Sequence, residues 1–393
     1  MRSIGRRPME GTRGLAGLRI FFVFGTLGLG GTERQALQLA RYLRGEHRSD
    51  VRILGLSREK GRFATLCDEN GIPWQTIPVD WPAGKLGRAM AIAGFARRLR
   101  QERPDVLFSY NWLPNVLCGL TWRLSGAAIL VWNQRNEGHD LDRSRSHRAA
   151  AHFTPCYISN SLHGKNFLVD TYGIDPGKVA VIPNGVCLPL AGHGRNEWRR
   201  RLGLDADTFV ACMVANLTAY KDHPTVLAAW RDVLDRTAGG GPPAVLLLAG
   251  RLDYREPALK KIAFDLDLCG RVRFLGEIED VAGLLSTSDL CVHSSNMEGC
   301  PNAVLEAMAA GLPVVATDIP GIREAVGPEG FRFLAPPGDP KGLADRILEF
   351  MSGAGVRSSV GSSMRRRVET EFDPRRMCER TAEFIEASLG RPA

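Results

Sequence analysis

The sequence predicts an α/β protein made of two doubly wound domains, each with a parallel sheet. Short β-branched and apolar runs alternate with helical patterns, and this series occurs twice along the chain. The expected strands are almost continuously apolar, which is typical of strands covered by helices on both faces. The 393 residues are enough for two ordinary domains.

The first series of strands is expected in residues 17–187 and the second in residues 188–375. The strands expected in the first series are 18–25, 50–56, 105–110, 127–132, 156–161 and 178–185. Those expected in the second are 209–216, 244–250, 271–277, 290–295, 313–319 and 331–336. Helical patterns such as 32–44 and 223–236 lie between strands. We expect residues 376–393 to form a final helix that can pack back on the first domain.

A basic segment precedes the first expected strand and could be confused with a signal peptide. However, the apolar run "LRIFFVFG" is short and β-rich, leads directly into a glycine loop and has no small-residue cleavage site. We therefore expect residues 1–16 to be a disordered leader.

The composition favours a cytoplasmic protein. The nine cysteines are scattered and never spaced as C-x-x-C, which indicates free thiols rather than a disulfide framework or a zinc site. No apolar run is long enough to span a bilayer. The basic segments lack the aromatic residues typical of nucleic-acid binding, so no nucleic-acid partner is expected.

The formal net charge is +8, and arginines cluster at 97–103, 195–201 and 365–367. Each cluster is best explained as a solvated helix face. The alternative is attraction to phosphorylated substrates or to an anionic membrane, which would place the protein peripherally at the inner face of the plasma membrane. Residues 85–103 can form a helix with an apolar face and an arginine-rich face; packing of the apolar face against the first sheet is the simpler interpretation.

A glycine-rich loop, "FGTLGLGGTERQ", joins the first strand to the first helix. It is no dinucleotide fingerprint, because Glu33 occupies the third glycine position counted from Gly28, and no Gly-Lys-Ser/Thr follows for a P-loop. Either the loop is a turn of no chemical role, or its backbone at Gly30 and Gly31 approaches a ligand, with helix N–H groups facing an anion.

Two acids lie in the apolar segment "NMEGCPNAVLEAMAAGLPVVA". Glu298 precedes a Gly-Cys-Pro turn, and Glu306 lies on the following helix, which Pro301 starts. This helix comes after an expected strand, so N–H groups near Asn302 and Ala303 would favour an anion such as a diphosphate.

Glu306 lies about 7.5 Å along the helix axis from Pro301 and could reach the hydroxyl groups of a sugar. Glu298 would lie on the other side of the anion, so the two acids would bracket a nucleotide diphosphate. The alternative is a buried ion pair plus a surface acid.

The segment "SSNMEGCPNAVLEAMAAGLPVVATDIPGIRE" resembles the E-x7-E region of the family-four retaining glycosyltransferases, which have the GT-B fold of two Rossmann-like domains facing across a cleft. Three further segments are similar to that family: "GLGGTERQALQLARYL", the interdomain "VIPNGV", and "VANLTAYKDHPTVLAAW". The resemblance covers nearly the whole chain after the leader. The acid motif and "IPNG" together are highly specific, whereas the glycine loop alone is not.

The resemblance implies that Glu306 holds the ribose and that Glu298 approaches the donor sugar. Lys221 matches a lysine on the diphosphate. Asn216 stands where many members have an arginine, and Arg251 is an alternative phosphate contact. The other donor contacts implied are Gly30, Gly31, Gly276, Ile278, Cys300, Pro301, Asn302 and Ala303.

The first domain departs from the family at one expected contact. Where many members have a histidine that touches the donor sugar, this chain reads "VWNQRNEG". Arg135 or Asn136 would take that place, and Arg135 would then join Glu298 and Lys221 as a catalytic residue. For Arg135 the alternative is an ordinary surface-loop arginine.

These implications predict a retaining hexosyltransferase or related enzyme of the EC 2.4 class. It would move a sugar from a UDP- or GDP-linked donor to a glycan or lipid-linked acceptor, in cell-surface polysaccharide or glycoconjugate synthesis. No D-x-D lies at an expected strand end, so neither a metal nor a cofactor is expected, and the helix N terminus with Lys221 would stabilise the departing diphosphate. The alternatives are a GT-B nucleotide-sugar epimerase and a catalytically silent glycan-binding subunit.

Overall fold

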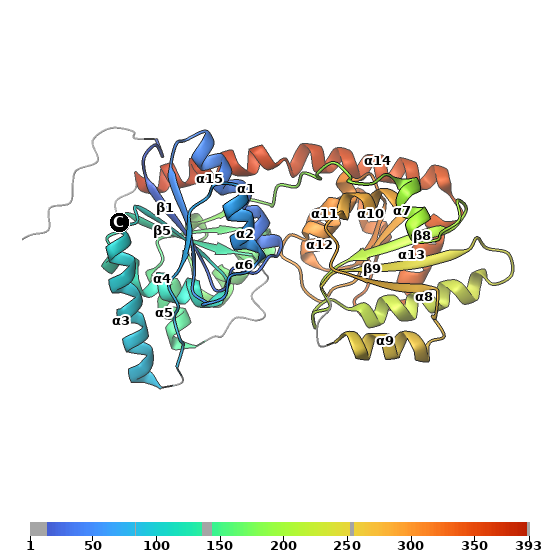
Figure 1. Ribbon diagram of the computed structural model, residues 1–393, viewed down its shortest axis with the longest axis horizontal. Coiled ribbons are helices and arrows are strands. Elements are labelled where there is room, and N and C mark those ends of the chain that lie inside the picture. The colour runs from blue at the N-terminus through green and yellow to red at the C-terminus, as the bar shows by residue number, and fades with distance from the viewer. Residues whose placement is uncertain (1–13, 83, 136–143, 252–254, 391–393) are drawn as a thin grey trace, which may run out of the picture. The chain divides into compact units, whose positions relative to one another are not determined.

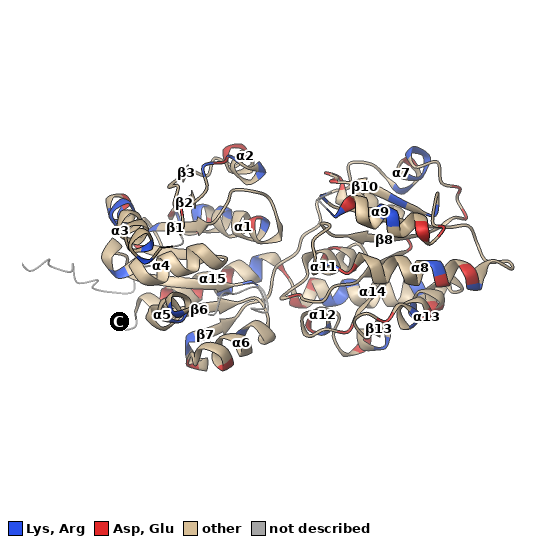
Figure 2. Cartoon of the chain, turned by 90° about the horizontal axis from the view of Figure 1, so that it is seen from below, with Lys and Arg blue, Asp and Glu red and all other residues tan. Residues whose placement is uncertain are grey.

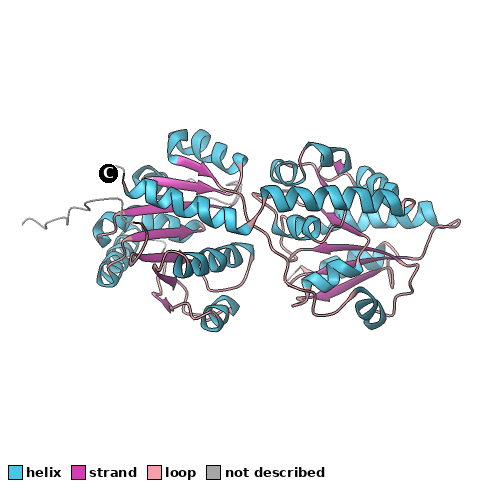
Figure 3. Cartoon of the chain, turned by 90° about the horizontal axis from the view of Figure 1, so that it is seen from above, coloured by secondary structure: helices cyan, strands magenta, loops and turns pink. Residues whose placement is uncertain are grey.

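The computed structural model describes residues 14–82, 84–135, 144–251 and 255–390. The chain forms two compact units: unit 1 comprises residues 1–185 and 374–393, and unit 2 comprises residues 186–373. In each unit, helices cover both faces of a parallel sheet (Figures 1 and 3). The α/β class with two parallel sheets is therefore confirmed. The unit boundaries differ by two residues from those expected.

Unit 1 contains a seven-stranded sheet of order β3-β2-β1-β4-β5-β6-β7. Its strands are β1 (Arg19–Phe24), β2 (Asp50–Gly55), β3 (Trp74–Thr76), β4 (Val106–Tyr110), β5 (Ile129–Gln134), β6 (Cys156–Ser159) and β7 (Val179–Val181). Ile20 of β1 is in register with Val51 and with Val106. The edge strand β3 was not expected, because its three residues are only half-buried and carry no apolar run.

Seven α-helices and one short 3-10 helix surround this sheet in the described part of unit 1. They are α1 (Gly31–Gly45), α2 (Arg62–Glu69), α3 (Lys85–Glu102), α4 (Trp112–Ser125), α5 (Arg145–Phe153), α6 (Leu162–Tyr172), η1 (Pro176–Lys178) and α15 (Pro374–Leu389). The last helix packs on α1. Its buried Met377, Cys378, Ala382 and Ile385 belong to the same apolar cluster as β1.

The expected leader is too long at its carboxyl end. Leu15 is fully buried in the unit 1 core, and its carbonyl oxygen accepts a hydrogen bond of 2.9 Å from the Ser49 hydroxyl. Burial of this leucine beside Ile20 fixes the chain before the first strand, so the expectation that residues 14–16 are disordered is wrong. Residues 1–13 lie outside the described residues.

Unit 2 contains a six-stranded parallel sheet of order β10-β9-β8-β11-β12-β13. Its strands are β8 (Phe209–Val214), β9 (Ala244–Ala249), β10 (Val272–Gly276), β11 (Leu290–His293), β12 (Val314–Thr317) and β13 (Leu334–Ala335). Its helices are α7 (Arg195–Arg201), α8 (His223–Thr237), α9 (Glu256–Asp265), α10 (Val281–Thr287), α11 (Asn302–Ala309), α12 (Pro320–Val326), η2 (Pro328–Phe333), α13 (Pro340–Met351) and α14 (Ala354–Glu371).

The last expected strand, at residues 331–336, is mostly wrong. Its first three residues belong to the 3-10 helix η2, and only Leu334 and Ala335 pair with β12. Pro328 favours a helical start. Gly327 takes a φ of 71°, which favours a turn immediately before η2.

Helix α14 packs on α11 through a glycine. A Cβ at Gly361, in the middle of α14, would lie 1.9 Å from the carbonyl oxygen of Gly311, which follows α11. Gly355, near the start of the same helix, has open space around its Cα. The position of α14 against α11 therefore depends on residue 361 having no side chain.

We expect Gly361→Ala to lower the free energy of unfolding by about 1–3 kcal/mol, because overpacking must push α14 away from α11. Gly355→Ala is the matched control and should be neutral or stabilise by up to about 1 kcal/mol, because alanine is the better helix former. Urea denaturation of the two variants tests this contrast. Equal stability of both variants would contradict the packing described.

Candidate active site

The loops that follow β8 and β11 meet at the carboxyl edge of the unit 2 sheet. β9 lies on one side of β8 and β11 on the other, and doubly wound sheets bind ligands where the strand order reverses in this way. An antiparallel bridge pairs Lys221 with Ser295. The Asn296 N–H donates to the Tyr220 carbonyl oxygen over 2.8 Å. The two loops are thereby held together.

Glu298 is buried with two nitrogen groups around one of its oxygens. The Lys221 ammonium donates to Oε1 of Glu298, and Nε2 of His293 lies 2.8 Å from the same oxygen. The Lys221 and Glu298 side chains are only 13% and 11% exposed, and His293 is fully buried. We call these three residues the Glu298 cluster.

The charges of the cluster follow from its burial. Burial acts to raise the pKa of Glu298, but Lys221 and His293 together outweigh it and lower the pKa to about 2. Burial and the nearby Lys221 lower the pKa of His293. The imidazole is therefore neutral at neutral pH. Because a carboxylate only accepts hydrogen bonds, Nε2 of His293 carries the ring proton.

The backbone around the Glu298 cluster leaves no room for larger side chains. A Cβ at Gly321, in the first turn of α12, would lie 2.0 Å from the Glu298 carbonyl oxygen.

A second buried histidine, His223 at the start of α8, lies close to Lys221. Its Nδ1 is 3.0 Å from the Lys221 carbonyl oxygen. His223 is 1% exposed, and its burial lowers the pKa to about 4.

The second acid lies one turn into α11. The helix begins after Pro301 with no side-chain cap, so Asn302 and Ala303 form its first turn. Glu306 is half-buried. The hydrogen bond with Cys212 and burial raise the pKa of the Cys291 thiol of β11, and the negative charge of Glu306 adds to this in the same direction. The alternative interpretation of the two acids thus holds for one of them: Glu298 is in a buried ion pair, whereas Glu306 is not a surface acid.

The other expected donor contacts of unit 2 also lie at carboxyl ends of strands. Asn216, after β8, accepts a hydrogen bond of 2.9 Å from the Arg251 backbone N–H, after β9. The Gly250 N–H donates to the Gly276 carbonyl oxygen over 2.9 Å. Ile278 packs against the core beyond β10. The Asn216 side chain therefore connects two loops, and its phosphate contact, like that of Arg251, stays a prediction.

In unit 1 the glycine loop is tied to its own helix. Gly30 caps α1 and Gly31 starts it, while the Glu33 carboxylate accepts hydrogen bonds from the backbone N–H groups of Gly30 and Glu33. A Cβ at Gly30 would lie 2.9 Å from Oε2 of Glu33. Burial is the main cause of the raised pKa of Glu33. The Glu33 carboxylate thus makes the acid's half of a capping box, without the Ser or Thr at the N-cap that marks the full motif in a sequence.

Arg135 is half-buried at the end of β5. Its guanidinium donates to Oδ1 of Asn184 over 2.6 Å, and it lines a small cavity of about 20 Å³ with Gln35, Tyr110 and Asn133 among others. Asn184 belongs to the "IPNG" segment, so that motif holds Arg135. The competing candidate, Asn136, lies outside the described residues. Contact of Arg135 with the donor sugar stays a prediction.

Known proteins share this organisation. A family model described as Glycosyltransferase Family 4 matches residues 29–188, and one described as Glycosyl transferases group 1 matches residues 194–367. The chain belongs to the family-four glycosyltransferases, with the GT-B fold. The expected family and the expected GT-B fold are thereby confirmed. In this glycosyltransferase the Glu298 cluster falls within the group 1 match and Arg135 within the family-four match.

Individual relatives agree with the assignment. The chain is 24% identical over 304 residues to an Escherichia coli UDP-Gal:alpha-D-GlcNAc-diphosphoundecaprenol alpha-1,3-galactosyltransferase, covering 75% of this chain and 77% of the relative. It is 32% identical over 182 residues to a Geodermatophilus obscurus D-inositol 3-phosphate glycosyltransferase, covering 43% of this chain and 39% of the relative.

Solved structures show the same fold. Anabaena HepE in complex with UDP-glucose superposes with a TM-score of 0.81 at 22% identity, covering 94% of this chain and 100% of HepE. A glycosyltransferase from Rickettsia africae gives a TM-score of 0.80 at 18% identity, covering 96% and 100% of the two chains.

The buried histidines predict a loss of stability in acid. With its pKa lowered from 6.5 to about 4, His223 binds a proton more readily in the unfolded chain than in the folded one. Its stabilising effect is complete above about pH 6.5 and falls as the pH drops toward 4. We expect about 2–3 kcal/mol less free energy of unfolding at about pH 4.5 than at pH 7.

Urea denaturation across this pH range measures the slope. His223→Asn should flatten it, although His293 still contributes in the same direction. His152→Asn is the control, because that exposed residue of α5 should leave the slope unchanged. An unchanged slope in His223→Asn would show that His223 does not remain neutral in the folded protein.

Proposed function

We propose that this glycosyltransferase moves a sugar from a nucleotide-sugar to an acceptor with retention of anomeric configuration and without a metal. The observation that carries the proposal is the buried, ionised Glu298 beside Lys221 and the start of α11. Burying a charge pair costs free energy of folding, so a buried pair at the carboxyl edge of a parallel sheet indicates a functional role. Binding of a charged donor would be that role.

Lys221 and α11 would stabilise the leaving diphosphate. The donor phosphates would lie against the first turn of α11, where the helix dipole favours negative charge. Lys221 would supply the cation that a metal supplies in other transferases. Glu306, one turn further along α11, would accept hydrogen bonds from the two ribose hydroxyls.

Glu298 is better suited to positioning than to nucleophilic attack. Its Oε1 is already held by Lys221 and His293, the groups that would face the leaving phosphate. A nucleophile must reach the opposite face of the sugar. We therefore favour reaction on one face, with Glu298 orienting the donor and stabilising positive charge as the anomeric bond breaks.

The bond changes balance without a protein nucleophile. The anomeric C–O bond breaks and its electron pair stays with the diphosphate. The acceptor oxygen then bonds to the anomeric carbon on the same face, and its proton passes to a phosphate oxygen. His293 is positioned to keep the Glu298 carboxylate fixed throughout.

We propose that the acceptor is a lipid-linked saccharide. The enzyme would then act in cell-surface glycoconjugate synthesis, at the inner face of the plasma membrane. The Escherichia coli relative is named for a diphosphoundecaprenol-linked acceptor. Trp81, which precedes α3, and Trp112, the first residue of α4, have rings that meet edge to face at 6.1 Å, and the guanidinium of Arg88 in α3 lies over Trp81. Such rings offer apolar faces to a sugar, and Arg88 offers a charge to a phosphate.

The outer face of α3 supports contact with a membrane. Phe95, Ala96 and Leu99 are buried, whereas Leu86 and Met90 are 77% and 67% exposed. The expected apolar face thus packs only in its second half. Exposed arginines follow along the helix (Figure 2). Among the described residues, no helix combines the length and hydropathy needed to cross a bilayer.

The two acids should separate binding from turnover. We expect Glu306→Gln to weaken the affinity for UDP or GDP by about 1.5–3 kcal/mol, because a neutral amide replaces a charged acceptor. Glu298→Gln should lower turnover strongly while nucleotide affinity stays close to that of the native enzyme. Calorimetry and product assays measure the two effects. Unchanged nucleotide affinity in Glu306→Gln would remove the ribose assignment.

The products decide the reaction itself. Retention, with nucleotide release that requires an acceptor, is the expected result. Release without acceptor would favour an epimerase, and no release would favour a glycan-binding subunit. A sugar bound covalently to Glu298 would overturn the one-face mechanism, and an inverted product would overturn retention.

The enzyme should bind anionic vesicles weakly and in a salt-sensitive manner. Leu86→Gln/Met90→Gln should reduce sedimentation with phosphatidylglycerol vesicles about tenfold or more, because two apolar side chains no longer enter the bilayer. Leu124→Gln is the matched control, since Leu124 is 60% exposed on α4 and should not matter. Equal sedimentation with anionic and neutral vesicles would argue for a soluble acceptor.

A further inference from the structure

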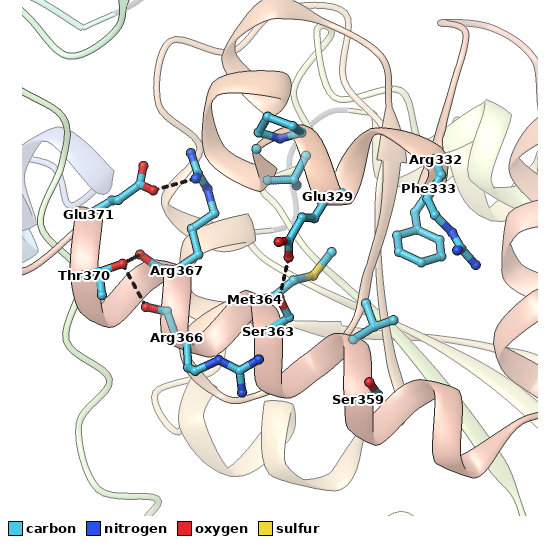
Figure 4. Close-up of a pocket in the computed structure, with 15 residues that line it drawn as sticks. Glu329, Arg332, Phe333, Ser359, Ser363, Met364, Arg366, Arg367, Thr370 and Glu371 are labelled. Carbon is cyan, nitrogen blue, oxygen red and sulfur yellow. Dashed lines mark hydrogen bonds and ion pairs between the residues drawn. The ribbon is translucent and has the colours of Figure 1, made fainter.

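A groove of about 710 Å³ lies between η2 and α14 in unit 2 (Figure 4). Its size is typical of small-molecule sites. None of its lining residues belongs to the loops that carry Lys221 and Glu298. Apolar side chains of Val326, Phe333, Val360 and Met364 line it together with charged and hydroxyl groups.

The two walls of the groove are held in place by their own contacts. Arg367 of α14 donates to the carbonyl oxygens of Ala325 and Glu324 over 2.9 and 3.0 Å, and to Glu371 over 2.6 Å. A Cβ at Gly327 would lie 2.6 Å from the Arg367 guanidinium carbon. Across the groove, the Ser363 hydroxyl donates to Glu329 over 2.7 Å. The groove therefore exists before any ligand enters it.

Two other arginines of the groove, Arg366 and Arg332, do not hold its walls together as Arg367 does. Arg366 makes no ion pair with any residue in the described ranges, although Arg365 and Arg367 beside it pair with Glu369 and Glu371. Arg332 of η2 is 68% exposed; its guanidinium lies over the Phe333 ring at 4.6 Å and makes one long ion-pair contact of 3.8 Å, with Glu349. Figure 4 shows Arg366 on α14 and Arg332 on η2, with their guanidinium groups well apart. A guanidinium group that is not held by a close acid suits a phosphate or carboxylate group.

The groove also presents a hydrogen-bond acceptor. Glu329 points into it (Figure 4), and the Ser363 bond uses only Oε2. A bare anion would be repelled by this carboxylate, whereas sugar hydroxyls would donate to it. Ser359 adds a hydroxyl on the α14 wall. Cations, a carboxylate, hydroxyls and apolar surface together fit a saccharide that carries a negative charge.

We propose that the groove between η2 and α14 binds an anionic saccharide, with Arg366 on its phosphate or carboxylate group and Glu329 on its hydroxyls. This site is separate from the proposed donor site. A carbohydrate-synthesising enzyme would use it to hold a charged part of its acceptor or product away from the reacting end.

Calorimetry with glucose 1-phosphate tests the proposal, with saturating UDP present to occupy the donor site. We expect one glucose 1-phosphate per chain, and about tenfold or greater weakening in Arg366→Gln, because a charged hydrogen bond is lost. Arg365→Gln is the matched control: it removes the same charge one residue away, outside the groove, and should bind as the native enzyme does. Equal weakening in both variants would overturn the proposal.

Two further titrations separate the parts of the ligand. Glu329→Gln should weaken glucose 1-phosphate but not inorganic phosphate, whereas tighter binding of glucose 1-phosphate by this variant would contradict a role for Glu329 in holding hydroxyls. Glucuronic acid in place of glucose 1-phosphate shows whether a carboxylate or a phosphate is preferred, and binding of neither ligand would overturn the proposal. UDP affinity should be unchanged in every groove variant, so failure here is distinct from failure of the donor site.

Discussion

The burial of Glu298 together with Lys221 is the interaction on which the site depends. Neither charge could be removed from water alone without a cost of several kcal/mol. The pair therefore requires the loops after β8 and β11 to lie side by side, and the sheet order supplies this. The Lys221–Ser295 bridge, the closeness of Gly321 to the Glu298 carbonyl oxygen and the neutral His293 all serve to fix the same pair.

Much of this arrangement could be predicted from local sequence. Apolar runs and glycine or proline boundaries locate most strands, and the spacing of Glu298, Pro301 and Glu306 places both acids around one helix start. The role of His293 could not be predicted, because a single histidine at the end of an apolar strand has no local signal. The bond between Arg135 and Asn184 joins residues 49 positions apart and depends on the order of the strands.

Arginine in this protein illustrates how one residue type serves unlike purposes. In the cluster at 195–201, Arg199 is 5% exposed and donates to the Thr208 carbonyl oxygen, so it is not part of a solvated face as expected. In 365–367, Arg367 supports a turn while Arg366 is left without an ion pair among the described residues. The exposed arginines of α3 make no ion pair with any of the described residues. Net charge alone therefore says little about which cations face a ligand.

The position of α15 has a consequence for biosynthesis. Unit 2 is one continuous stretch of chain, whereas unit 1 needs residues 374–389 to complete its apolar cluster. During synthesis on the ribosome, the apolar surface of unit 1 that α15 covers stays exposed until α15 has been made. The later-made unit can finish first. Chaperone dependence during translation should accordingly fall on the half of the protein that is synthesised earliest.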